Sequence, residues 1–336
     1  MWMLENKTPF EVERTWIRDK EGIHHWIVVV KATYDIAANG KLSLSEKPLP
    51  PLYIPEYRGV YGESSLRYEA DLVAMKTKTD VYLNGIAYAP QGKPCRKVKV
   101  TFQIASLKKS LIVTGERRWK RTLFLRISSS SPKMFRAMPI TYEGAYGGFD
   151  QEDENPKKHR IDFRNPVGSG LAYRKRHLLG KAAPHIVDPS RKMGKGAPAG
   201  FGALASYWSP RKELAGTYDQ HWEATRKPLL PKDYNPDCLQ SAPRDQQVKG
   251  YLQGGEKVEL QNLSPNGLLR FTLPKISLGF ETYFGSRRET HSSQLVSVVI
   301  NSEGPQLILV WQTSLRCGKD EDYLDKTVIE EKAHNQ

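Results

Sequence analysis

The sequence contains no long apolar run. The longest ones, at residues 26–30 and 307–311, have the length of a β-strand and fall well short of the span of a bilayer. The amino terminus, MWMLENKTPF, carries an acidic residue and a proline early and no apolar core, so a secretory signal is not expected. These absences predict a cytoplasmic protein that has no membrane partner.

Cysteine is scarce as well. The three cysteines, Cys95, Cys238 and Cys317, are odd in number and lie far apart in the sequence. This usage is typical of free thiols in a reducing compartment. It argues against a disulfide framework and against a Cys-x-x-Cys metal site.

Recognised catalytic signatures are absent too. There is no Gly-x-Ser-x-Gly elbow, and glycine pairs such as the one at 200–202 are not followed by the Gly-Lys-Ser/Thr of a phosphate-binding loop. Asp219-x-His221 could contribute to a metal site, with His177 or His185 as a distant third ligand. An ordinary surface histidine is the simpler interpretation, so we expect no metal and no cofactor.

Three aspartates leave one enzymatic interpretation open. Asp219, Asp233 and Asp245 lie in an irregular stretch where they could approach one another, as the acids of a hydrolase do. Each stands beside turn residues, however, so helix capping and pairing with arginine are the simpler roles. We therefore expect that the protein is not an enzyme, and we keep a hydrolase as the alternative.

Positive charge is plentiful and unevenly distributed. The formal net charge is +14, and residues 151–200 contain 11 Lys or Arg against 5 Asp or Glu. A second basic group spans 117–121. Such a balance can attract nucleic acid, an anionic surface or an acidic protein. The sequence has no zinc-finger spacing, ribonucleoprotein strand motif or helix-turn-helix pattern, so nucleic acid is not the expected partner, and a nucleic-acid-binding module remains only an alternative.

Alternating patterns in both terminal parts predict β-strands. The clearest is at 97–104, where Val98, Val100, Phe102 and Ile104 alternate with polar residues, so one face is buried and the other is wet. Strand patterns are also found at 25–34, 79–88, 107–113, 123–127, 258–263 and 269–273, and in a hairpin that joins 295–300 to 307–311. They predict a mainly β fold, an antiparallel β-sandwich or a distorted barrel with long irregular loops and few short helices.

The central part of the chain lacks such periodicity. Between 198 and 247, prolines at 210, 228, 231, 236 and 243 exclude long helices and central strands, yet large aromatic residues are frequent. We interpret it as ordered, irregular chain that lies over the outside of the sheets. The organisation expected is one unit, 1–336, with an N-terminal β region at 1–131, an irregular region at 132–255, a C-terminal β region at 256–318 and a charged tail at 319–336, as a short helix or frayed strand.

Ordered sequence blocks cover nearly the whole chain and match one family. They lie at 6–10, 31–35, 69–72, 76–81, 84–90, 115–119, 138–148, 165–170, 198–202, 208–211, 216–222, 228–234, 242–246 and 254–256. In these blocks the chain resembles a bacterial family of type VI secretion accessory proteins. His221 is not part of the pattern, which further weakens the metal interpretation. The basic residues between 157 and 195 fall between blocks.

The resemblance implies a function. Members of that family are understood as adaptors or chaperones that stabilise a cognate effector protein and help to load it onto the secretion spike. They are encoded near spike-tip proteins of the proline-alanine-alanine-arginine (PAAR) class. The expected partners are therefore an effector, bound at its amino-terminal or spike-associated segment, and a PAAR-type protein. An effector-modifying enzyme and a structural part of the secretion machine are the alternatives.

Aromatic and arginine residues are the natural anchors of such a binding surface. We expect Trp208, Arg211, Tyr218 and Trp222 to bind the partner, held in place by aspartates. An exposed sheet edge could also accept a strand from the partner. The complete set of predicted partner-binding residues is Trp208, Arg211, Tyr218, Asp219, Trp222, Asp233, Asp245, Gln246, Arg118 and Trp119.

Overall fold

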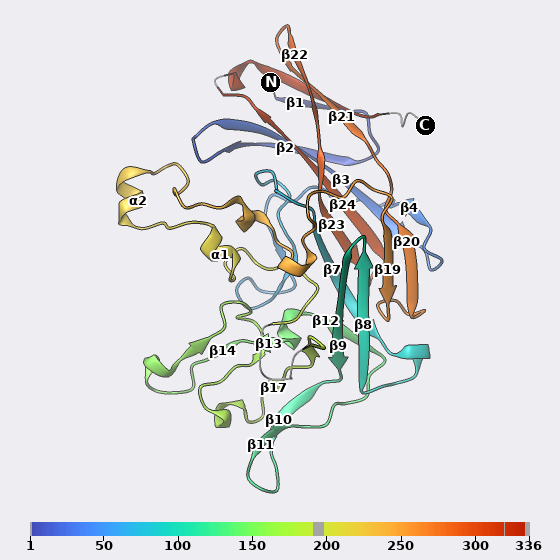
Figure 1. The fold of residues 1–336 in the computed structure, drawn as a ribbon, viewed down its shortest axis with the longest axis vertical. Coiled ribbons are helices and arrows are strands. Elements are labelled where there is room, and N and C mark those ends of the chain that lie inside the picture. The colour runs from blue at the N-terminus through green and yellow to red at the C-terminus, as the bar shows by residue number, and fades with distance from the viewer. Residues whose placement is uncertain (1, 191–197, 319, 333–336) are drawn as a thin grey trace.

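The computed structural model describes residues 2–190, 198–318 and 320–332. The protein is mainly β, as the sequence predicts: its helices are a few short turns at the edges of several sheets (Figure 1). Three larger sheets form the body of the molecule. No sheet in the described ranges closes into a barrel.

The central sheet combines strands from both ends of the chain. Its order is β12 (Ala137–Ile140), β7 (Asp80–Tyr88), β23 (Gln294–Asn301), β24 (Gln306–Arg316), β3 (His24–Ile36) and β2 (Glu11–Arg18), and β4 (Leu42–Leu44) pairs with β3. The predicted hairpin of β23 and β24 is confirmed. However, β7 pairs with β23 in parallel, so the sheet is mixed and not purely antiparallel.

Two further sheets cover one side of the central sheet. The five-stranded sheet has the order β18 (Ile186–Val187), β9 (Leu107–Thr114), β8 (Lys97–Ile104), β19 (Lys257–Gln261) and β20 (Leu268–Thr272). The four-stranded sheet has the order β1 (Met3–Asn6), β25 (Leu324–Glu331), β21 (Leu278–Phe284) and β22 (Arg287–Ser292). In β8 the alternating apolar side chains are buried, as predicted, because they face this shared interior.

A single apolar cluster joins the three sheets. It contains Val28 and Trp311 from the central sheet, Phe102 from the five-stranded sheet and Phe280 from the four-stranded sheet. The indole N–H of Trp26 also crosses between sheets and donates to Thr327 Oγ1 at 2.8 Å. Both terminal parts of the chain therefore share one core.

The opposite face of the central sheet is covered by irregular chain. Ile27 and Val299 of the sheet pack in a second cluster with Tyr68, from the short strand β6 (Leu66–Tyr68), and with Ala203 and Ala242, which come from loops. The expected irregular covering is therefore confirmed. Its regular elements are short: the helices α1 (Arg211–Leu214) and α2 (Gln220–Thr225), and 3₁₀ turns that include η4 (Lys175–Leu178), η5 (Pro236–Leu239) and η6 (Arg244–Gln246). No helix in the described ranges has the length and apolar composition needed to cross a bilayer.

Two sequence predictions were wrong in this architecture. The charged tail forms a strand, one of the two alternatives expected, but the strand is not frayed: β25 is an interior strand, hydrogen-bonded to β1 on one side and β21 on the other. Residues 123–125 are not in a strand but in the turn between β10 (Arg117–Arg121) and β11 (Ile127–Ser129), because the hairpin closes there. Residues 319 and 333–336 of the tail, and 191–197 of the basic region, lie outside the described residues.

Candidate functional site

Most of the predicted binding residues lie in or beside residues 208–239, which we call the α1–α2 segment. Figure 1 shows it extending to one side of the sheets. Proline-rich chain forms this shape because side chains satisfy its backbone: Asp219 caps α2 by accepting from the backbone N–H of Trp222 at 2.8 Å. Asp233 accepts from the backbone N–H of Thr217 at 3.0 Å and from its hydroxyl at 2.8 Å. Both aspartates therefore have structural partners.

The base of α2 is fixed to the body of the protein. Arg226 donates to the carbonyl of Leu230 at 3.0 Å and also to the carbonyl of Lys20, in the turn between β2 and β3. Lys20 in return donates to the carbonyl of Lys232 at 2.9 Å. The segment is therefore braced at both ends of its outer loop, and little conformational entropy would be lost when it binds a partner.

The aromatic pair of this segment is accessible on one side. Tyr218 and Trp222 meet edge to face, with ring centroids 4.8 Å apart. The indole N–H of Trp222 donates to the carbonyl of Leu229 at 2.8 Å, so this ring mainly supports the loop. Tyr218 is 53% exposed and is the member of the pair that a partner can contact.

Trp208 and Arg211 are buried, which contradicts their predicted role as surface anchors. Trp208 is fully enclosed and packs edge to face against Tyr142. The Arg211 guanidinium forms an ion pair with Glu69 and donates to the carbonyls of Leu204 and, at 2.8 Å, Cys238. Burial leaves no surface for a partner to contact, so both residues hold the base of the segment in place.

Asp245 and Gln246 also have structural roles. Lys109 of β9 donates to Asp245 at 2.9 Å and to Gln246 at 2.7 Å. The buried Gln246 amide in turn donates to the carbonyls of Val81 and Phe201, at 2.9 and 2.8 Å. Burial lowers the pKa of Lys109, against the opposing effect of Asp245. These contacts attach η6 to the two larger sheets, and Asp245 does not join Asp219 and Asp233, which line one small pocket.

Arg118 and Trp119 belong to a different part of the molecule. They lie on β10, at the far end of the view from α2 (Figure 1). Arg118 is exposed and donates to the carbonyl of Gly180 at 2.8 Å, whereas Trp119 is half-buried. The structure therefore does not bring these two residues to the α1–α2 segment.

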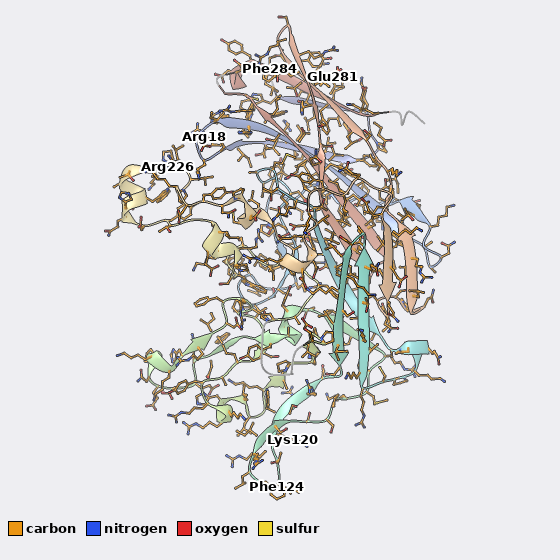
Figure 2. All side chains as sticks on the ribbon, in the orientation of Figure 1. Arg18, Lys120, Phe124, Arg226, Glu281 and Phe284 are labelled. Atoms are coloured by element: carbon orange, nitrogen blue, oxygen red, sulfur yellow. The ribbon has the colours of Figure 1, made fainter. Side chains whose placement is uncertain are left out.

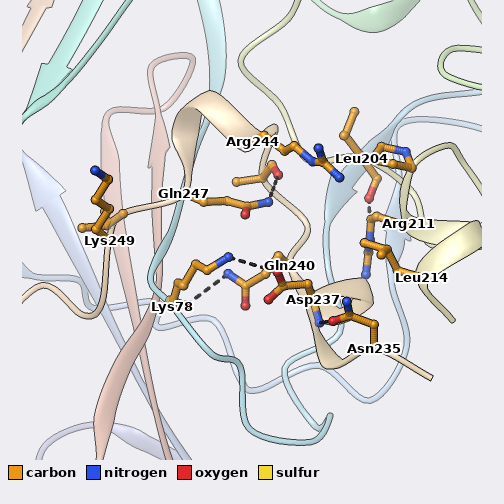
Figure 3. Close-up of a pocket in the computed structure, with 13 residues that line it drawn as sticks. Lys78, Leu204, Arg211, Leu214, Asn235, Asp237, Gln240, Arg244, Gln247 and Lys249 are labelled. Atoms are coloured by element: carbon orange, nitrogen blue, oxygen red, sulfur yellow. Dashed lines mark hydrogen bonds and ion pairs between the residues drawn. The ribbon is translucent and has the colours of Figure 1, made fainter. Parts of the chain in front are cut away.

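A pocket of about 470 Å³ lies at the base of the α1–α2 segment (Figure 3). Sequence reasoning missed it because its walls come from four separate stretches without a common motif. A hydrogen bond from the Thr77 hydroxyl and an ion pair with Lys78 hold the pKa of the Asp237 carboxyl below its ordinary value, so that carboxylate is already paired. Arg244 and Lys249 also line the pocket and are exposed, and neither forms an ion pair with another described residue.

The pocket also contains an acceptor without a donor. Gln240 is 1% exposed; its amide nitrogen donates to Asp80 at 3.0 Å and to the carbonyl of Lys78 at 3.2 Å. These two acceptors fix the amide orientation, and Gln240 Oε1 is left without a hydrogen-bond partner in the described structure. Gln240 Oε1 is enclosed and is not open to a ligand, whereas the exposed cations Arg244 and Lys249 suit a ligand that carries acidic groups.

Three buried ion pairs hold the walls of this region on the central sheet. Besides the pair of Glu69 and Arg211, Lys31 Nζ lies 2.7 Å from Asp71, and Lys76 Nζ lies 2.9 Å from Asp80. The acids and Lys76 all come from the sequence blocks at 69–72 and 76–81. These blocks therefore serve the architecture of the site, a role that their charge alone did not reveal.

The histidines that the structure describes do not gather as a metal site. His177 Nδ1 contacts Asp150 at 2.8 Å, and both side chains are buried. Burial disfavours ionisation of Asp150, but hydrogen bonds from His177 and two backbone amides outweigh it and lower the pKa of the carboxyl. Within the described ranges, no group of three His, Cys, Asp or Glu side chains is arranged to hold a metal ion.

No curated protein matches the sequence, and no solved structure matches the chain. A family model described as an uncharacterized protein conserved in bacteria, DUF2169, matches residues 21–312, from the turn before β3 into β24. Because this match covers most of the chain, the protein belongs to the DUF2169 family of bacterial proteins.

Proposed function

We propose that this protein is a cytoplasmic adaptor that binds a cognate type VI secretion effector, stabilises it and helps to load it onto the spike. The observation that carries the proposal is the pocket at the base of the α1–α2 segment, where Arg244 and Lys249 are exposed and form no ion pair with another described residue. The family resemblance of the sequence blocks supplies the secretion context. A PAAR-type spike-tip protein is the second proposed partner.

The chemistry of the pocket favours a polypeptide segment with acidic side chains. Carboxylates of such a segment would pair with Arg244 and Lys249. Tyr218, exposed on the same projecting segment, would add apolar contact area at a small entropic cost because the loop that carries it is braced. Affinity would therefore come from a few anchors on a rigid support, without a chemical step.

The test is copurification with the cognate effector, in full length and without its amino-terminal segment. We expect the full-length effector to be captured and the shortened one to be lost. Equal capture of both forms would refute the proposal that this segment is the bound one, and capture of neither would refute the adaptor function.

Surface variants connect the test to the pocket. Arg244→Glu combined with Lys249→Glu should weaken effector binding by about tenfold or more, because it reverses the charge that pairs with the acidic segment. The matched control is Lys97→Glu combined with Lys99→Glu: these two lysines are exposed on β8 and change the net charge by the same amount. Equal loss in both variants would indicate a general charge effect and not this pocket.

A further inference from the structure

The hairpin of β10 and β11 ends in an exposed apolar turn, which we call the hairpin tip (residues 123–125). Leu123 is 98% exposed, Phe124 86% and Leu125 75%. The turn is ordered by hydrogen bonds from Thr122 to the carbonyl of Arg126 and from Leu125 to the carbonyl of Thr122, at 2.8 and 2.9 Å. Leu125 has a φ of 55°, a left-handed position where glycine or asparagine is usual. A leucine here therefore serves neither the core nor the turn.

The strands that carry the tip are strongly basic. Residues 117–142 contain seven Lys or Arg and no Asp or Glu. Lys120, Arg121 and Arg126 are exposed next to the tip, and Lys175 of η4 lines the same surface hollow. None of these four forms an ion pair with another described residue, so their charge is available to an anionic partner. Figure 2 shows Phe124 at the end of the hairpin and Lys120 closer to the body of the protein.

We propose that this hairpin binds the surface of an anionic lipid bilayer, with the tip in the acyl boundary and the four cations at the headgroups. Apolar residues at an extremity with basic residues directly behind them match the two layers of such a surface. A fluid surface also needs no complementary shape, which suits a convex tip. Of the three tip residues only Phe124 could stack on a base, and the two leucines could not, so nucleic acid fits the tip less well.

This inference departs from the expectation, drawn from the sequence, that the protein has no membrane partner. That expectation came from the lack of an apolar run of bilayer length, whereas peripheral binding needs only a few apolar residues and a basic patch. The hairpin is separate from the α1–α2 segment, so the inference does not depend on the adaptor proposal. It gives the protein a second surface, by which it would be held at a membrane while the first surface is occupied.

The test is sedimentation of the purified full chain with vesicles. We expect binding to phosphatidylcholine vesicles that contain about one third phosphatidylglycerol, and binding weaker by about tenfold or more to pure phosphatidylcholine. Raising the salt from about 0.1 M to about 0.5 M should release most of the protein, since screening shortens the reach of the cations. Failure to sediment with the anionic vesicles, or equal binding to both kinds, would overturn the proposal.

Two variants separate the apolar from the electrostatic contribution. Leu123→Ser with Phe124→Ser, and separately Lys120→Glu with Arg121→Glu, should each reduce anionic vesicle binding by about tenfold. Because all four side chains are exposed, the fold should be unaffected, which circular dichroism would check. The controls are Ile54→Ser, at a site that is 74% exposed, and the paired Lys97→Glu and Lys99→Glu.

The outcomes of these variants also distinguish a protein partner. If the tip variant sediments like the wild type, the interaction is purely electrostatic and the inference fails. If both hairpin variants keep vesicle binding but lose effector copurification, the hairpin is a protein contact and the inference also fails. If Phe124→Trp, but not Ile54→Trp, adds fluorescence that brominated lipid quenches, the tip enters the bilayer as proposed.

Discussion

Replacing Arg211 with methionine should destabilise the protein strongly, because the guanidinium is the only described cation paired with the buried Glu69. The side chains are 6% and 9% exposed, so loss of the arginine would leave a carboxylate in the interior without a counter-ion. The carbonyls of Leu204 and Cys238 would lose a donor as well. Breaking a buried pair in this way costs about 3–5 kcal/mol.

The cost converts into a measurable shift in melting temperature. With an unfolding entropy of about 2.1 cal/mol/K per residue, a chain of 336 residues has about 0.7 kcal/mol/K in total, so we expect Tm to fall by about 4–7 °C. Thermal unfolding followed by circular dichroism, with a urea titration beside it, would measure both the shift and the loss of free energy.

Two controls make this prediction specific. Arg211→Met combined with Glu69→Gln removes both charges, so it should be about 2 kcal/mol more stable than Arg211→Met alone. Arg270→Met breaks the pair with Glu259, in which both side chains are exposed, and should cost less than about 1 kcal/mol. If Arg211→Met cost no more than Arg270→Met, Arg211 would not be the buried support that we describe.

Three further predictions follow from the same structure. Trp208→Ala should lower the free energy of unfolding, measured in urea, by about 3–5 kcal/mol, because it leaves a cavity beside Tyr142. A loss under about 1 kcal/mol would contradict the burial of Trp208. Burial lowers the pKa of His291 from 6.5 to about 4. Between these two pH values the imidazole therefore binds a proton in the unfolded chain but not in the folded chain. The contribution of His291 to the free energy of unfolding should therefore be fully present above pH 6.5 and be lost as the pH drops towards 4, by up to about 3 kcal/mol. The variant His291→Gln should lack this part of the pH dependence, as measured by urea unfolding. Tyr218→Ala should leave Tm within about 2 °C of the wild type while weakening effector capture, and unchanged capture would exclude Tyr218 as an anchor.

The strands that the sequence predicted well are those whose own residues alternate between apolar and polar. In β8 the alternation of apolar and polar residues follows from one buried face, and that is visible without a partner. The pairing of β7 with β23 could not be predicted, because the strands are more than 200 residues apart and either could join several neighbours. β25 was missed for a related reason: its charged residues made it look solvated, although Leu324 and Ile329 are fully buried.

The sequence indicated where the projecting segment lies, but neither the pocket at its base nor the roles of most of its side chains. The irregular stretch around 208–239 does form a projecting segment, and Tyr218 is exposed on it. Arg211 was taken for a surface anchor because its partner, Glu69, is 142 residues away in the sequence. Gln240 lines the pocket only because Asp80 and Lys78 orient its amide, which is a tertiary effect that local pattern does not contain.

The most direct test of the central claim is isothermal titration of the effector's amino-terminal segment into the purified protein. We expect saturable binding by the wild type, and binding about tenfold weaker or more when Arg244 and Lys249 are both replaced by glutamate, with Lys97→Glu and Lys99→Glu as the charge-matched control. Absence of binding by the wild type, or equal affinity of the pocket variant, would contradict the account.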